Sequence, residues 1–391
     1  PKLDFGRIRA LLLWGRNMAV ASVAAFRDLN AAVKRGLKLI VIDPNSTETS
    51  EVADLHLRIT PGTDGLLALS FIKKAIEDYD LSPEAQRQVG WDRLKHHVLG
   101  LSYDRLLEKA GLTKDQFNLA SELVFNNLPA GNTTGLGLEL LPIGVQSIRA
   151  VACLQSLVDP GHFPSAISMP VNPLPNQAYY PERSEPVGRH QAPLFVERGG
   201  EGQAMYLPQA VFDRDPYPVK SLLVVGANPA LTFPGTPAQI EMYRQLDFLA
   251  VCDLFMTATA RRAHLVLPAA DFLNSMELHD YGRVGKPYLG LVRPIPHIAP
   301  GWPVWKWVFK IAHTLGLREF FPWEDNDAAL TFQLAGTQIE LDTLKGSPAS
   351  VAPYLPPIED HTSHEVHYFS AAAEAAGSMG LPTADTLELP Y

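Results

Sequence analysis

Cysteine is nearly absent from this chain of 391 residues. Cys153 and Cys252 are the only two, and each stands inside an apolar run. No C-x-x-C pair exists, so ligation of zinc or of an iron–sulfur cluster by cysteines of this chain is excluded. A disulfide between the two thiols stays open, although their apolar surroundings favour buried free thiols.

Other familiar signals are missing as well. Neither H-E-x-x-H nor G-x-S-x-G occurs, so a two-histidine metal site and a serine nucleophile elbow have no support. No apolar run reaches the roughly 18–20 residues of a membrane-spanning helix, and the start shows no signal-peptide pattern. The net charge of −9 gives no general attraction to nucleic acid. We expect no nucleic-acid partner and no membrane span, and the sequence leaves the cellular location open.

The chain does have length and apolar mass. Hydrophobic residues make up 46% of it and charged residues 19%, an ordinary globular balance. Because 391 residues exceed one typical core, we expect two domains, residues 1–165 and 166–391. The second would include an irregular proline-rich insert at 169–219, which could line a substrate funnel, and a helical extension at its end. Within this insert, Arg189 and His190 are interpreted as loop residues because no periodicity surrounds them. The chain begins with Pro1 and enters a predicted strand at Arg9, which suggests a piece of a longer protein.

A strand that stops on a glycine and turns into a helix is predicted twice. The two stretches are LLLWGRNMAVA at 11–21 and SLLVVGANPAL at 221–231. In the first copy we expect a strand at 9–14, a helix at 18–34 and a second strand at 39–42. In the second copy we expect strands at 222–225 and 248–252 around a helix at 237–244.

The spacing between the two copies is constant. Equivalent residues stand 210 or 211 positions apart: Gly15 and Gly226, Asn17 and Asn228, Asp43 and Asp253, Thr47 and Thr257, Thr49 and Thr259, Leu55 and Leu265, Leu57 and Leu267. Such a constant offset indicates duplication, and the strand–helix–strand order predicts parallel sheets. The predicted fold class is α/β, with two similar parallel-sheet, Rossmann-like domains related by internal duplication.

Both Gly-x-Asn turns and both aspartates would lie at the carboxyl ends of strands, where parallel sheets bind ligands. Glycine lets the backbone approach a phosphate, and a helix N-terminus offers free N–H groups. An aspartate that closes the second strand commonly binds a ribose hydroxyl. Two such sites suggest two nucleotides, or one cofactor with two nucleotide tails. The simpler alternative is that the glycines only make tight turns and the aspartates only cap helices.

Several segments together resemble the molybdopterin oxidoreductases of the dimethyl sulfoxide reductase family. They occur in family order across residues 9–282: WGRN, VIDPNSTETSEVADLHLRITPGTDGLLAL, GLGLE, PYPVKSLLVVGANP, VCDLFMTATARRAHLVLPA and FLNSMELHDYG. The resemblance implies a bis-molybdopterin guanine dinucleotide cofactor with molybdenum or tungsten, each dinucleotide lying along one α/β domain. Two turns would then serve two guanine dinucleotide tails.

The resemblance also implies roles for individual residues. In the first domain, Gly15 and Asn17 would approach a pyrophosphate, Asp43 would hold a ribose, and Thr63 and Asp64 would face the guanine. In the second domain, Gly226 and Asn228 would approach the other pyrophosphate, and Asp253 and Thr257 would hold the second guanosine. Near the pterin and metal would lie Gly135 and Gly137. No residue of this chain is assigned as catalytic or as a metal ligand.

The chain also departs from the family. Asn45 stands where members usually have arginine, and Leu140 stands where glutamine is common. The family's N-terminal region, with its 4Fe-4S cysteines and metal ligand, and its C-terminal domain would lie outside this chain. We therefore expect these two parts, and an iron–sulfur electron-transfer subunit of the kind used in anaerobic respiration, as partners. The chain alone should show no turnover.

Two other classes of protein share part of this pattern. The large subunit of respiratory complex I keeps a similar fold without molybdenum, as a non-catalytic structural module. The presence of Asp64, Asp253 and Thr257 favours genuine cofactor binding over that reading. A nucleotide-dependent dehydrogenase is disfavoured, because G-x-G-x-x-G follows neither strand.

Overall fold

The computed structural model describes residues 5–141, 143–160, 185–193, 195–196, 202–280, 288–295, 301–354 and 368. The chain forms two compact units. Unit 1 comprises Pro1–Met169 and Asp360–Tyr391, and unit 2 comprises Pro170–Glu359.

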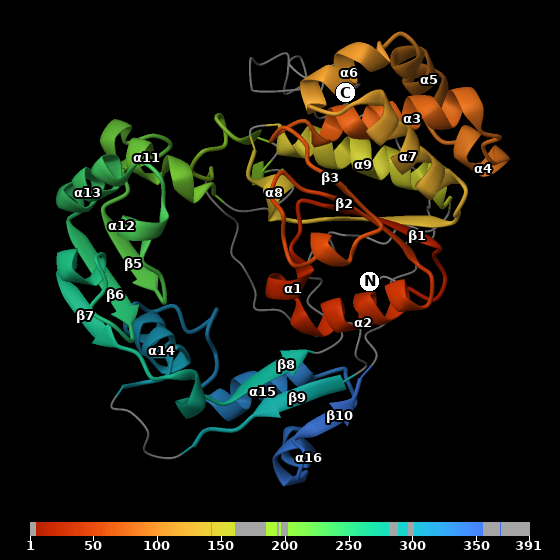
Figure 1. Ribbon diagram of the computed structural model, residues 1–391. Coiled ribbons are helices and arrows are strands. Elements are labelled where there is room, and N and C mark those ends of the chain that lie inside the picture. The colour runs from red at the N-terminus through yellow and green to blue at the C-terminus, as the bar shows by residue number, and fades with distance from the viewer. Residues whose placement is uncertain are drawn as a thin grey trace. The chain divides into compact units, whose positions relative to one another are not determined.

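A parallel four-stranded sheet of order β3-β2-β1-β4 forms the centre of unit 1 (Figure 1). Its strands are β1 (Ala10–Trp14), β2 (Lys38–Ile42), β3 (Leu55–Leu57) and β4 (Ala130–Thr134). Leu12 of β1 lies opposite Ile40 of β2 and Asn132 of β4. All five residues of β1 are buried, because a central parallel strand is covered on both faces.

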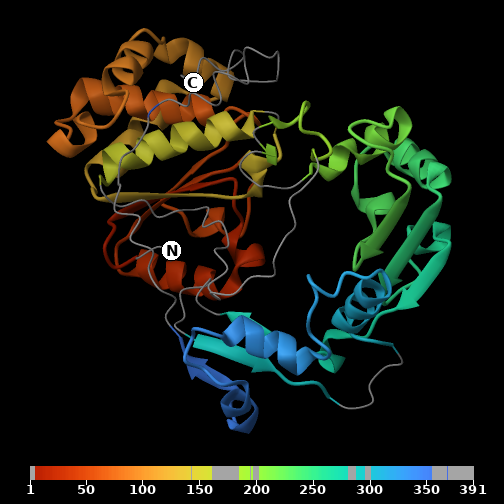
Figure 2. The same cartoon turned by 180° about the vertical axis from the view of Figure 1, so that it is seen from behind.

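Successive side chains of β1 enter different cores, as the two-residue period of a strand requires. Leu12 and Trp14 pack with residues of α3 (Asp64–Asp78) and α9 (Gly144–Val158), whereas Leu11 and Leu13 pack with α2 (Val23–Lys34). Figures 1 and 2 show α3 and α9 on one face of the sheet and α2 on the other. The remaining helices of the unit are α1 (Met18–Ala21), η1 (Ser50–Val52), α4 (Pro83–Gln86), α5 (Trp91–Leu99), α6 (Tyr103–Ala110), α7 (Lys114–Phe125) and α8 (Leu136–Glu139).

The first helix differs from the expectation of one helix at 18–34. It is divided into α1 and α2 at Ser22, whose φ of −152° is not helical. The Ser22 hydroxyl accepts a hydrogen bond from the Arg16 guanidinium at 3.3 Å. Ser22 is both the C-cap of α1 and the N-cap of α2, so the two short helices meet at this residue.

A second parallel sheet, of order β5-β6-β7, forms the centre of unit 2. Its strands are β5 (Ser221–Val225), β6 (Phe248–Asp253) and β7 (Leu265–Pro268). Val224 and Val251 pack with Met242 of α13 (Thr236–Gln245) and Val211 of α11 (Leu207–Asp213). The predicted α/β class with parallel sheets is thus confirmed.

The rest of unit 2 carries an antiparallel sheet of order β10-β9-β8. Leu289 and Leu291 of β9 pack with leucines of α15 and α16. The elements not yet bounded are η2 (Ala204–Tyr206), α12 (Pro229–Thr232), η3 (Ala260–Arg262), η4 (Phe272–Asn274), β8 (Glu277–Asp280), β9 (Tyr288–Val292), α14 (Val304–Thr314), α15 (Asn326–Leu334), α16 (Leu341–Gly346) and β10 (Val351–Pro353). Among the described helices, none combines the length and the apolar character needed to cross a membrane.

Candidate cofactor-binding edges

The chain leaves β1 of unit 1 through a left-handed glycine. Gly15 has a φ of +54°, and its N–H donates to the Ile42 carbonyl at 2.8 Å, which ties the turn to the end of β2. A residue with a Cβ is strained at this φ, so glycine is required by the backbone itself. The turn delivers Asn17 to the N-cap of α1 at the carboxyl edge of the sheet.

The Asn17 side chain joins this turn to the loop that follows β2. Its Oδ1 accepts from the Thr49 hydroxyl at 2.8 Å, and its Nδ2 donates to Glu48 Oε2 at 2.8 Å. The bond from Asn17 lowers the pKa of Glu48. Thr49, fully buried, also accepts from the Ala19 N–H at 3.0 Å, so one threonine holds both the Asn17 side chain and the first turn of α1.

Gly135 and Gly137 lie directly against the Gly15 turn, just after β4. A Cβ added at Gly135 would stand 2.3 Å from the Gly15 carbonyl oxygen, and one at Gly137 would stand 3.2 Å from the same atom. Two glycine-bearing turns can therefore meet without side chains between them. Beside them the buried Thr134 hydroxyl has no hydrogen-bond partner among the described residues. A buried unpaired hydroxyl at a strand end is what a polar ligand at this edge would satisfy.

Two aspartates stand near the same edge of unit 1. Asp43 follows β2 and accepts from the Asn45 N–H at 2.8 Å, while Asp64 begins α3 and is only 5% exposed. Burial, and to a smaller extent the charge of Asp43, raises the pKa of Asp64 to about 6. Thr63, the N-cap of α3, donates its hydroxyl to the Thr60 carbonyl at 2.6 Å.

The carboxyl edge of the unit 2 sheet repeats this geometry. Gly226 has a φ of +57° and its N–H donates to the Cys252 carbonyl at 2.9 Å. Asn228 Oδ1 accepts from the Thr259 hydroxyl at 2.9 Å, and Thr259 accepts from the Ala230 N–H at 3.0 Å. A Cβ at Gly226 would meet no atom within 4 Å, so the space in front of this turn is open.

Asp253 and Thr257 also occupy matching positions. Asp253 Oδ1 accepts from the N–H two residues ahead, that of Phe255, at 2.9 Å, as Asp43 does from Asn45. Thr257 Oγ1 accepts from the Ala260 N–H at 3.1 Å, as Thr47 does from the Ser50 N–H at 3.2 Å. The structure therefore brings the predicted residues of each unit to one sheet edge.

Some residues at these edges had no predicted site role. Thr49 and Thr259 hold the asparagines, and Thr134 and Glu48 stand beside the first turn. The signal for the two threonines was present in the sequence, because their 210-residue offset matches that of the predicted aspartates.

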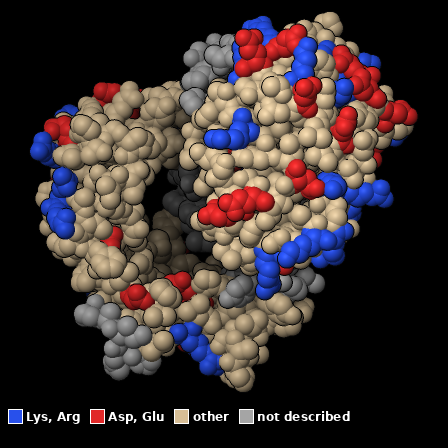
Figure 3. All heavy atoms as spheres, viewed as in Figure 1, with Lys and Arg blue, Asp and Glu red and all other residues tan. Residues whose placement is uncertain are grey.

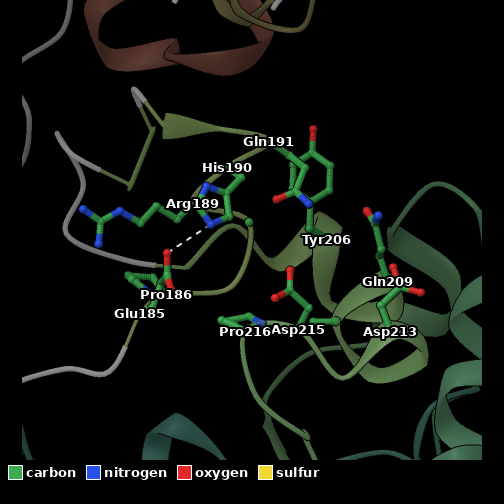
Figure 4. A pocket seen from close by; sticks show the side chains of 12 residues that line it. Glu185, Pro186, Arg189, His190, Gln191, Tyr206, Gln209, Asp213, Asp215 and Pro216 are labelled. Carbon is green, nitrogen blue, oxygen red and sulfur yellow. Dashed lines mark ion pairs between the residues drawn. The ribbon is translucent and has the colours of Figure 1, made fainter. Parts of the chain in front are cut away.

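A small pocket elsewhere in unit 2 contains Arg189 and His190, which the sequence suggested as loop residues. His190 Nε2 pairs with Glu185 Oε1 at 3.1 Å, and the His190 side chain is 72% exposed (Figure 4). The cavity volume is about 20 Å³, which is room for about one water molecule. By itself this pocket holds no substrate.

No metal site made of protein side chains is found in the part of the chain that the structure describes. Cys153 and Cys252 are both free and buried, as their apolar surroundings suggested.

Parallel sheets whose glycine turns, helix starts and aspartates meet at the carboxyl edge are typical of α/β proteins that bind ligands at this edge. The sequence family described as molybdopterin oxidoreductase matches residues 4–281. The chain belongs to this family, whose members of the dimethyl sulfoxide reductase type include the relatives below. Family membership implies a molybdenum or tungsten pterin cofactor.

Curated relatives and a solved structure agree with this assignment. Acetylene hydratase of Syntrophotalea acetylenica is 26% identical over 86% of this chain and 51% of its own length. The thiosulfate reductase molybdopterin-containing subunit of Salmonella typhimurium is 24% identical over 85% and 47%, and the assimilatory nitrate reductase catalytic subunit of Bacillus subtilis is 25% identical over 70% and 41%. The chain thus spans about half the length of the curated relatives it matches. The acetylene hydratase structure from Pelobacter acetylenicus shares the fold, with a TM-score of 0.80 at 22% identity over 97% of this chain and 58% of that one.

Proposed function

We propose that this chain holds a bis-molybdopterin guanine dinucleotide cofactor, with one dinucleotide along the carboxyl edge of each parallel sheet. The observation that carries the proposal is the repeated Gly–Asn–Thr arrangement. Gly15, Asn17 and Thr49 form it in unit 1, and Gly226, Asn228 and Thr259 form it in unit 2. One such turn would serve one nucleotide tail, and two turns serve a cofactor with two.

We also propose that the parallel-sheet parts of the two units arose by internal duplication. The domain boundaries expected from the sequence, 1–165 and 166–391, differ from these units in assigning residues 360–391 to the second domain. Equivalent backbone bonds support this proposal. Gly15 and Gly226 both donate to the last or next-to-last residue of the neighbouring strand. The N–H of Leu39 and that of Leu249 both donate to a side chain that stands 15 residues further on, at 2.8 and 2.9 Å.

The residues fit the chemistry of a guanine dinucleotide. Left-handed Gly15 and Gly226 expose backbone at which a pyrophosphate can lie, with Asn17 and Asn228 at the helix starts behind them. Gly135 and Gly137 extend this glycine-lined surface toward the pterin, next to the unpaired Thr134 hydroxyl.

The sugar and base would be held by carboxylates and hydroxyls. Asp43 would bind the first ribose, and Thr63 and Asp64 the first guanine, whose N1–H and N2–H donors match a carboxylate. Asp64 is buried with a raised pKa, so donors from a bound base would lower its cost of ionisation. Asp253 and Thr257 would hold the second guanosine.

Bound here, the metal would supply two-electron redox chemistry, while this chain orients the cofactor and shapes its electrostatic surroundings. The relatives' names include a hydratase and two reductases. The reductases carry out two-electron chemistry, whereas the addition of water by a hydratase involves no net electron transfer. For the intact enzyme we propose a two-electron transfer, as in the reductases, with the substrate left open. The chain alone should be inactive, with the metal ligand, the 4Fe-4S cluster and the covering domain supplied by other parts of the enzyme.

Calorimetric titration of the 391-residue chain with GDP and ADP tests the proposal. We expect weak binding with a preference for GDP, and loss of that preference in Asp64→Asn. The matched control is Asp115→Asn, which also changes an aspartate in the first turn of a helix, at an exposed position. Equal binding of GDP and ADP by the unmodified chain would contradict the guanine assignment.

A further inference from the structure

A basic pocket lies on unit 2 away from the proposed cofactor edge. Its volume is about 450 Å³, and it is lined by Ile240, Tyr243, Arg244, Arg261, Arg262 and His264. No carboxylate is among these lining residues. Figure 3 shows Lys and Arg side chains gathered over α13 and beside β6, at the left edge of the face in view.

The pocket belongs to the opposite end of the strands from Gly226 and Asp253. His264 immediately precedes β7, and its Nδ1 accepts from the N–H of Leu249 near the start of β6. Arg244 stands in the last turn of α13, the helix that leads back to the start of β6. At about 3.3 Å per residue, the start of β6 lies roughly 15 Å from the edge where Asp253 stands.

Every lining group with a free polar end is a hydrogen-bond donor. Because His264 Nδ1 accepts a backbone bond, the proton of the neutral ring is on Nε2. Arg262 donates one guanidinium N–H to the Ala258 carbonyl at 2.6 Å, and Arg244 forms an ion pair with Glu241 at 3.3 Å. The Arg261 guanidinium has no ion-pair or hydrogen-bond partner among the described residues. Several forked donors in one concave site suit oxyanions with more than one charged group.

The fold does not require this charge. At the positions 210 residues earlier in unit 1, Glu51 and Val52 stand in place of Arg261 and Arg262, and Asp54 stands in place of His264. Asp54 Oδ2 accepts a hydrogen bond from the Leu39 N–H at 2.8 Å, just as His264 Nδ1 accepts one from the Leu249 N–H. The same local structure is therefore built in unit 1 without a basic side chain at any of these three positions. The counterpart of Arg244 is basic as well, since Lys34 stands in the last turn of α2.

We propose that the basic pocket of unit 2 binds a small polyanion, with phosphate or carboxylate groups as the recognised chemistry. A cavity of this size lies within the range of about 300–1,000 Å³ that small-molecule sites occupy. The site is independent of the proposed cofactor role, because it uses none of the residues at the carboxyl edges.

Titrations of the 391-residue chain with inorganic pyrophosphate and with citrate test the proposal and separate its two sources. We expect saturable binding of at least one of them, weakened at least about tenfold in Arg244→Gln/Arg261→Gln. The matched control is Arg27→Gln/Arg35→Gln, which removes two exposed arginines of unit 1 and should leave the affinity unchanged. His264→Asp keeps the backbone acceptor that Asp54 provides in unit 1, so it should fold normally and still lose binding.

Three results would overturn the proposal. One is the absence of saturable binding of either anion in the millimolar range. Another is pyrophosphate binding that is insensitive to the pocket variants, which would place the anion at another site. The third is selective binding of an aspartate- and glutamate-rich peptide with no binding of either small anion, which would make the pocket a protein-docking surface. Circular dichroism and melting temperatures of all variants establish that lost binding is not lost folding.

Discussion

The carboxyl edges of the two parallel sheets share a turn and differ in what surrounds it. In unit 1, Gly15 is closely packed, since a Cβ added there would stand 2.8 Å from the Leu138 side chain. In unit 2, Gly226 faces open space, and β5 has no second neighbouring strand among the described residues, whereas β1 lies between β2 and β4. Short motifs thus determine the turn, while the neighbouring strand determines how tightly it is packed.

The two edges also differ in their acidic groups. Asp64 of unit 1 is a buried carboxyl at the start of α3. The residue 210 positions later in unit 2 is the uncharged Asn274, at the end of η4. The proposed guanine contacts are therefore not copied from one unit to the other, and variants should affect the two edges unequally.

The largest expected difference is in the cost of adding one methyl group to a glycine. Gly135→Ala should destabilise unit 1 by about 3 kcal/mol, because the new Cβ would stand 2.3 Å from the Gly15 carbonyl oxygen. Gly226→Ala meets no neighbour and should cost unit 2 only the roughly 1–2 kcal/mol of its left-handed φ. Amide hydrogen exchange, followed separately for each unit, measures the stability lost in each variant. Equal losses in the two variants would contradict the difference in packing around the two glycines.

A pH dependence should be seen in unit 1. Burial raises the pKa of Asp64 from 3.8 to about 6, so the folded state holds this proton more tightly than the unfolded state. Its contribution is therefore fully present below pH 4 and is lost as the pH rises through 6, by roughly 3 kcal/mol in total. Asp64→Asn should remove this slope and stabilise unit 1 at pH 7 to 8. Urea unfolding between pH 4 and pH 8 measures it; an unchanged slope in the variant would contradict the assignment to Asp64.

The free energy of unfolding should differ by a smaller amount between Asn228→Ala and Asn17→Ala. Asn228 Oδ1 accepts from both the N–H and the hydroxyl of buried Thr259, so Asn228→Ala strands a backbone donor and should cost about 2 kcal/mol. Asn17 Oδ1 accepts from the Thr49 hydroxyl, and its Nδ2 donates to the exposed Glu48, so Asn17→Ala leaves no buried backbone donor unpaired and should cost about 1 kcal/mol. Melting of each variant tests the order, which a larger loss in Asn17→Ala would reverse.

A further expected effect concerns cofactor retention in the intact enzyme. Asp253→Ala removes both the acceptor for the Phe255 N–H and the proposed guanosine contact. Retention should fall at least roughly tenfold, or about 1.4 kcal/mol. Asp253→Asn keeps an acceptor for the Phe255 N–H and serves as the matched variant. Metal content is measured beside the melting temperature, and full metal occupancy with a lowered melting temperature in Asp253→Ala would leave Asp253 as a turn cap alone.

The sequence predicted those elements whose signal is local. The apolar runs of β1 and β2, the glycine turns and the 210-residue offset were readable because strand burial and left-handed backbone restrict residue type directly. The strand β4 was missed, since its sequence AGNTT is polar. It is buried all the same: Asn132 accepts from the Trp14 indole at 2.9 Å, and its N–H donates to Gln155 at 2.8 Å. Such pairing across more than a hundred residues leaves no pattern within the strand.

The site was predictable to a similar extent. Residues at strand ends, such as Asp43 and Asp253, followed from the α/β rule alone. Thr134 and Glu48 became visible only when β4 and the loop after β2 were brought beside Gly15, because their relevance depends on neighbours distant in sequence.

The central claim is that each sheet edge holds one guanine dinucleotide. The most direct measurement is the guanine released by acid hydrolysis of the intact purified enzyme that contains this chain, relative to its molybdenum or tungsten. The account predicts two guanine nucleotides per metal atom. One guanine per metal would leave one of the two edges without its ligand, and metal without guanine would contradict the account at both edges.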